Sequence, residues 1–162
     1  MKKHNIIATI VVLLLAAYHS FLQVFDREEC HNALANSPHP NGDITLASEF
    51  TPTLTHLMVK KGAAAGGFAL CAATDKPLGP CTDTPTSGEK ANVRHLGAAT
   101  GTCVGRGSKA IAAQVEVYTT AAGKLTDTAV NNSYLVGTSV TACTGDGAEF
   151  EFVPCYPVKQ TV

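Results

Sequence analysis

The sequence contains no tryptophan, only 6% aromatic residues and only 15% charged residues among its 162 positions, and its net charge is −1. The Lys and Arg residues are spread along the chain and form no basic block. Nucleic-acid binding depends on a concentrated positive charge that faces the phosphates. We therefore expect no nucleic-acid partner. A chain of this length normally forms one domain, or two very small ones.

Small and β-branched residues are abundant instead, and the chain is rich in Ala, Thr and Gly. Thr and Val occur in short runs separated by Gly, Pro, Asp and Asn, which favours short strands joined by tight turns. The pattern predicts a mainly β fold, either a small β-sandwich or a β-barrel. Ten strands are expected, at 44–47, 54–60, 68–73, 78–82, 91–96, 102–104, 114–119, 125–128, 134–142 and 149–153.

The clearest strand signal is the alternation of Glu149 and Glu151 with Phe150 and Phe152. Successive side chains of a strand point to opposite faces, so both rings should be buried and both carboxylates exposed. Residues 114–117 repeat the pattern. Strands of this kind have one buried and one solvated face.

An internal repeat relates two parts of the chain at an offset of about 58 residues. Residues 59–66 align with 117–124, and Leu78-Gly79 aligns with Val136-Gly137. Each half is too small to bury a core alone. We therefore expect two similar turn-rich β units that share one core.

The N-terminal part differs from the rest. Two lysines precede an apolar run over 6–18, in the layout of a secretory signal, and 6–25 is long enough to cross a bilayer as a helix. Bulky residues at 18–19 make a poor cleavage site. We divide the chain into an apolar, helical segment that acts as an arm, signal or anchor (1–29), a linker (30–42), a β domain (43–156) and a C-terminal tail (157–162).

No pattern for catalysis, cofactor binding or metal binding is found. Residues 101–109 only superficially resemble a phosphate-binding loop, because Gly-Ser-Lys replaces the required Gly-Lys-Ser/Thr, and we interpret them as a surface turn. His56 and His95 are interpreted as packing residues of strands. The cluster of Cys30, His31 and His39 lacks a completing ligand. Four aspartates have turn contexts, where their side chains bond the local backbone: Asp75, Asp83, Asp127 and Asp146.

The six cysteines contain no C-x-x-C pair and no paired histidines at zinc-ligand spacing. Several lie where a strand needs a small buried residue, so free structural thiols are predicted. A disulfide framework is the alternative, since the count is even.

Four segments of the second half share an order and spacing with a known family: 109–118, 122–127, 135–137 and 145–154, echoed in the first half at 78–79 and 83–96. On these residues the body of the chain, about 43–156, resembles the phage head decoration or capsid cement proteins. The resemblance implies a non-enzymatic virion protein that binds the major capsid protein outside the head, often as a homotrimer, and stabilises the shell. It also implies assembly in the host cytoplasm.

A second hypothesis is an exported or membrane-anchored β domain of a cell envelope, held by residues 6–25. A membrane is an expected partner only in that case.

Overall fold

The computed structural model describes residues 42–162, which belong to one compact unit, His39–Val162. The expectations for the apolar segment 1–29, for the linker up to residue 41 and for the Cys30, His31 and His39 cluster lie outside the described residues. Within residues 42–162, no helix has the length and apolarity needed to cross a membrane.

The mainly β fold is confirmed, and a strand is present in each of the ten expected places. One short 3-10 turn, η1 (Ala121–Gly123), follows the seventh strand. The strands of residues 42–162 are β1 (Asp43–Ser48), β2 (Met58–Lys61), β3 (Gly67–Leu70), β4 (Pro77–Pro80), β5 (Lys90–Arg94), β6 (Cys103–Arg106), β7 (Glu116–Thr119), β8 (Leu125–Thr126), β9 (Tyr134–Ser139) and β10 (Glu149–Lys159).

The first five strands form one sheet in the order β4-β2-β3-β1-β5. The β1–β3 pair is parallel, and the other pairs are antiparallel. The two edge strands also meet, because Cys81 bridges to Val93 and the Leu96 N–H donates to the Leu78 carbonyl at 2.9 Å. The sheet therefore closes into a small barrel, which we call the first barrel.

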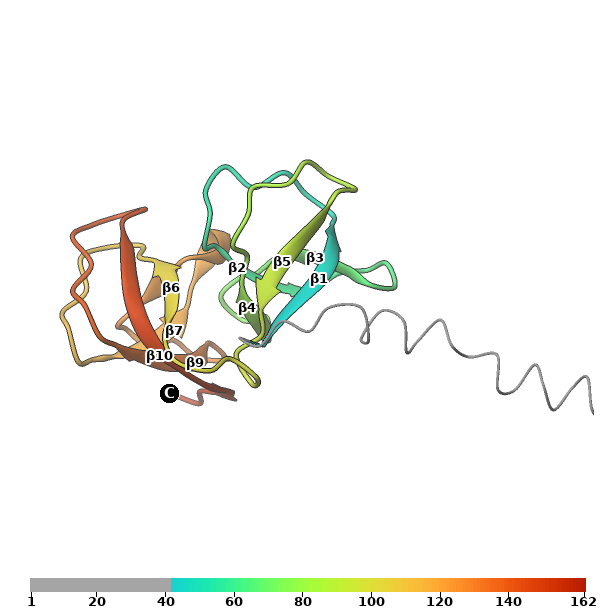
Figure 1. Cartoon of the computed structure of the whole chain (residues 1–162). Coiled ribbons are helices and arrows are strands. Elements are labelled where there is room, and N and C mark those ends of the chain that lie inside the picture. The colour runs from blue at the N-terminus through green and yellow to red at the C-terminus, as the bar shows by residue number, and fades with distance from the viewer. Residues whose placement is uncertain (1–41) are drawn as a thin grey trace, which may run out of the picture. The chain divides into compact units, whose positions relative to one another are not determined.

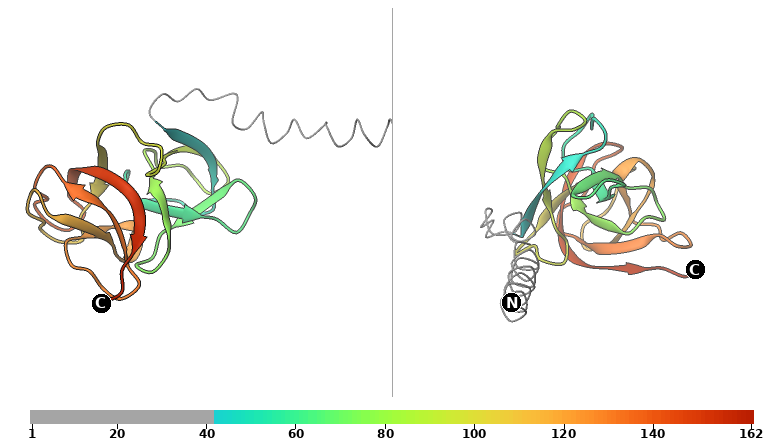
Figure 2. Two further views of the ribbon diagram at one scale, coloured as in Figure 1. Left: turned by 90° about the horizontal axis from the view of Figure 1, so that it is seen from below. Right: turned by 90° about the vertical axis from the view of Figure 1, so that its right-hand side faces the viewer.

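The last five strands form a second sheet in the order β6-β10-β9-β7-β8, and its named pairs are antiparallel. Its edges meet at a parallel bridge between Gly107 and Leu125, where the Ser108 N–H donates to the Leu125 carbonyl at 2.8 Å. We call this the second barrel. Figures 1 and 2 show the two groups of strands, cyan to yellow-green for the first and yellow to red for the second.

The two barrels have the same topology. When β1 to β5 are matched with β6 to β10 in sequence order, the strands follow each other around both barrels in the same cyclic order. The register agrees as well, since Val59 pairs with Gly79 in the first barrel and Val117 with Gly137 in the second. These residue pairs lie at the offset seen in the sequence, so the chain contains two similar β units.

Two of the repeated glycines lie where the backbones of neighbouring strands come unusually close. A Cβ atom at Gly79 would lie 1.8 Å from the carbonyl oxygen of Arg94, and one at Gly137 would lie 2.1 Å from that of Val153. Real Cβ atoms do not approach backbone that closely, so a residue without a side chain is required at both positions. This explains why the two Leu/Val-Gly dipeptides were visible as part of the repeat.

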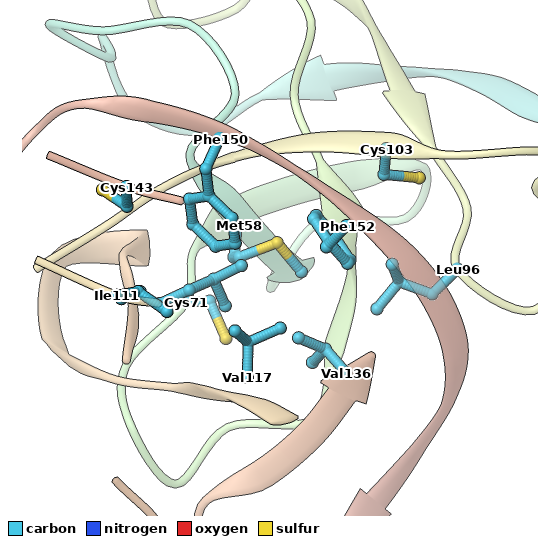
Figure 3. Packing of buried hydrophobic residues seen from close by; sticks show 11 residues of the cluster. Met58, Cys71, Leu96, Cys103, Ile111, Val117, Val136, Cys143, Phe150 and Phe152 are labelled. Atoms are coloured by element: carbon cyan, nitrogen blue, oxygen red, sulfur yellow. The ribbon is translucent and has the colours of Figure 1, made fainter. Parts of the chain in front are cut away.

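The buried hydrophobic residues form two clusters, which corrects the expectation of a single shared core. The smaller cluster fills the first barrel and includes Val59, Phe68 and Val93. The larger cluster fills the second barrel and includes Phe150 and Phe152, as their alternation predicted (Figure 3). It also takes in residues from the first half of the chain, so packing joins the barrels: Met58, Cys71 and Leu96.

Two strand boundaries differ most from the prediction. Residues 54–57 form a loop, in which His56 has a φ of 60° and its N–H donates to the Cys81 carbonyl at 2.6 Å. β10 instead continues to Lys159, past its predicted end at residue 153, although it contains Pro154 and Pro157. β6 pairs with β10 only as far as Phe152, so among the described residues the later part of β10 pairs with β9 alone. A proline is tolerated on such a one-sided stretch.

Candidate interaction surface

His56 belongs to a polar cluster that joins the barrels and is not simply a packing residue. Its Nδ1 lies 3.0 Å from Glu149 Oε1, and the Arg106 guanidinium lies 2.7 Å from the same oxygen. Arg106 Nε also donates to the Thr55 carbonyl at 2.9 Å. The His56 hydrogen bond and the Arg106 charge lower the pKa of the Glu149 carboxyl. The cluster attaches the 54–57 loop of the first barrel to β6 and β10 of the second.

Among the four aspartates singled out in the sequence, Asp75 bonds the backbone of its own turn as expected, whereas the partners of Asp83 and Asp146 lie 9 and 22 residues away. Asp75 accepts from the Ala72 N–H at 2.8 Å, and Asp83 accepts from the Asn92 N–H at 3.0 Å. Asp75, Asp127 and Asp146 also form ion pairs with lysines, at 2.8, 2.6 and 2.6 Å. These carboxylates stabilise turns and strand ends and do not converge on one point.

Residues 101–109 are more than the surface turn that the sequence predicted, because they contain β6. The polar groups that follow β6 are used inside the second barrel, where Ser108 donates from both N–H and Oγ to the Leu125 carbonyl. Lys109 pairs with Asp127. In the part of the chain that the structure describes, no group of three His, Cys, Asp or Glu side chains is placed to hold a metal ion.

Five cysteines lie among the described residues, and all five are free thiols. Four of them are buried, and Cys155 is half-buried. Burial raises the pKa of Cys71 to about 12 and that of Cys103 to about 11. Thiols with such pKa values remain protonated and unreactive at neutral pH.

The second half of β10 exposes large apolar side chains. Val153, Tyr156 and Val158 are 52%, 63% and 50% exposed, and we call these three residues the β10 strip. The three residues of the strip lie in the part of β10 that pairs with β9 alone. Exposed apolar residues on an unpaired strand edge are typical of an interaction surface. The sequence did not predict this surface, because the expected strand ended at residue 153.

A pocket of about 290 Å³ adjoins the strip. Its polar lining comes from Lys61 at the end of β2, Lys76 before β4, His95 after β5 and Tyr156 of β10. These ends converge because β2 pairs with β4 and the Leu96 N–H bonds to the Leu78 carbonyl of β4. We call it the seam pocket, since both barrels line it.

Lys76 and Tyr156 interact directly in the seam pocket. The Lys76 ammonium donates to the Tyr156 hydroxyl at 3.0 Å and lies 4.8 Å from the ring centroid. This hydrogen bond raises the pKa of Lys76 and lowers that of Tyr156. The contact holds the exposed tyrosine ring of the second barrel against the first.

These features define a class of protein: a small double β-barrel whose distinctive surface is an apolar strand edge beside a basic pocket. No protein-family model and no curated protein matches the sequence. Among solved structures, the fold is similar to that of the N base of the head fiber gp8.5 from bacteriophage phi29. The TM-score is 0.56 at 13% identity, and the match covers 74% of this chain and 98% of that one. The expected resemblance to phage head proteins is thus confirmed as a likeness of fold.

Proposed function

We propose that the chain is a non-enzymatic structural protein of a phage virion, a decoration or cement protein that binds the outside of the head. In this proposal it contacts the major capsid protein, assembles as a homotrimer, stabilises the shell, and joins the head in the host cytoplasm. The observation that carries the proposal is the likeness of fold to a base of a head fiber, because it covers nearly the whole of that chain. The order and spacing of the segments that resemble decoration proteins agree with this proposal.

The β10 strip is the surface we assign to docking. The chain has a net charge of −1, so long-range attraction contributes little, and close apolar contact must supply most of the affinity. Burial of a fully exposed valine side chain stabilises a complex by about 1.5–3 kcal/mol, and Val153 and Val158 are each half exposed. Each contact is therefore weak, and three copies in a trimer would raise the avidity without new contacts.

Co-sedimentation of the full chain with heads that lack it tests the proposal. We expect the chain to bind assembled heads and not free capsid subunits. A Val153→Asp, Val158→Asp double variant should bind about tenfold or more weakly, because two contacts are lost and two charges are desolvated. Val130→Asp is the matched control, since Val130 is 45% exposed but lies outside β10, and it should bind like the unaltered chain.

Absence of binding to heads would refute the proposal. Co-sedimentation with lipid vesicles that is lost when residues 6–25 are deleted would instead support the envelope hypothesis.

A further inference from the structure

The seam pocket gathers positive charge without a matching carboxylate. Within residues 42–162, Lys61, Lys76 and His95 take part in no ion pair. The acidic neighbour of Lys76 in the sequence, Asp75, is already held by Lys60 at 2.8 Å and by a backbone N–H. The pocket therefore has two lysine ammonium groups whose charge no described side chain neutralises.

The polar groups of the pocket are mostly donors. Each lysine ammonium has three N–H donors and no acceptor. The Tyr156 hydroxyl accepts from Lys76, which leaves its own proton free to donate toward the pocket. Such a set of donors complements a ligand that offers hydrogen-bond acceptors. Hydrogen bonds between a charged donor and a charged acceptor are stronger than those between neutral groups.

The remaining lining is apolar and comes from Pro77, Leu78 and Pro157. A hydrated inorganic anion gains nothing from these side chains, whereas an acidic side chain would bring methylene groups to them. The volume of about 290 Å³ is ample for one such side chain. Tyr156 belongs both to the pocket and to the β10 strip, so a partner docked on the strip reaches the pocket directly.

We propose that the seam pocket binds the carboxylate of an acidic side chain that the docking partner presents beside the β10 strip. Lys61 and Lys76 neutralise the carboxylate, the Tyr156 hydroxyl donates to it, and the two prolines and Leu78 contact its methylene groups. This inference rests on the proposed docking function and adds the chemistry that the partner must present.

Fluorine NMR on the full chain labelled with 3-fluorotyrosine tests the pocket without any capsid. The chain has four tyrosines, and Tyr156→Phe assigns the signal of interest by its loss. A capped Leu-Glu-Asp-Leu peptide should shift the Tyr156 signal saturably, and a capped Leu-Gln-Asn-Leu peptide should not. Lys61→Met and Lys76→Met should each weaken peptide binding about tenfold or more, since each removes a hydrogen bond to a charged group.

Lys90→Met is the matched control. Lys90 is exposed on the same barrel but lies at the start of β5, at the opposite end of that strand from His95. We expect this variant to bind the acidic peptide like the unaltered chain. An equal loss in Lys90→Met would show that only general charge matters, and would overturn the inference.

Two further ligands test whether the anion that the pocket binds comes from a protein side chain or from another source. Inorganic phosphate or glucuronate that saturates the Tyr156 signal at lower concentration than the acidic peptide would overturn the assignment to a protein carboxylate. So would a peptide that produces no shift.

Binding of the lysine variants to heads then separates the two proposals. If the unaltered chain binds heads and Lys61→Met binds equally well, the docking function stands and the pocket inference fails. If no form binds heads while the peptide still binds, the docking function fails.

Discussion

Replacing Gly137 by alanine tests the close approach of β9 and β10 on which the second barrel is built. The new Cβ would lie 2.1 Å from the Val153 carbonyl oxygen and 2.8 Å from the Phe152 ring. The nearer obstacle is backbone, so no side-chain rotation can relieve the clash, and the two strands must separate. Separation also disturbs Phe152, which is fully buried in the larger core cluster.

Overpacking a well-packed core costs roughly 1–3 kcal/mol, and the rigid obstacle places this variant at about 3 kcal/mol. Urea unfolding followed by far-ultraviolet circular dichroism measures the loss. With a slope of roughly 2 kcal/mol per molar urea, the midpoint should fall by about 1.5 M. Gly145→Ala is the control, because nothing lies within 4 Å of its added methyl group. We expect that control to change the free energy of unfolding by less than about 0.5 kcal/mol.

Gly79→Ala should destabilise the chain for the same reason, since its Cβ would meet the Arg94 carbonyl oxygen at 1.8 Å. If Gly137→Ala unfolds at the same urea concentration as Gly145→Ala, the strands are not as close as described and the account of the repeat is wrong.

Other predictions concern charge, thiols and domain boundaries. Glu149→Gln should lower the urea midpoint at pH 7. A carboxyl with a lowered pKa contributes stability only while it is ionised, so the difference between the variant and the unaltered chain should vanish as the pH falls below 4.5, the ordinary pKa of the group. Alkylation in denaturant without reductant should label all six cysteines, and a mass that corresponds to fewer than six labels would indicate a disulfide. In the native protein the buried Cys71 and Cys103 should resist labelling. A fragment of residues 42–162 should give dispersed amide NMR signals, because both core clusters lie within it, and collapsed signals would show that the N-terminal part is needed for folding.

Much of the fold was predictable because it depends on local patterns. Period-2 alternation located Phe150 and Phe152, and breakers marked the turns between all ten strands. The repeat was visible because a packing constraint, the close approach at Gly79 and Gly137, allows only one residue type at equivalent positions.

What the sequence could not reveal depends on contacts between distant residues. Residues 54–57 have a sequence typical of a strand, but they form a loop in which His56 bonds to Glu149 of the second barrel. The strip and the seam pocket were missed for two reasons. The predicted strand ended at residue 153, short of the end of β10, and nothing local indicates that Lys61, Lys76 and Tyr156 meet.

The proposal that this chain is a component of a phage head can be tested on the particle itself. The most direct measurement is mass spectrometry of gradient-purified particles of the phage that encodes it, combined with immunogold labelling of intact particles. We expect the chain in stoichiometric amount in the head fraction, with gold on the outer surface of the head. Its absence from purified particles, or its recovery only with host membranes, would refute the proposal that it is a head protein.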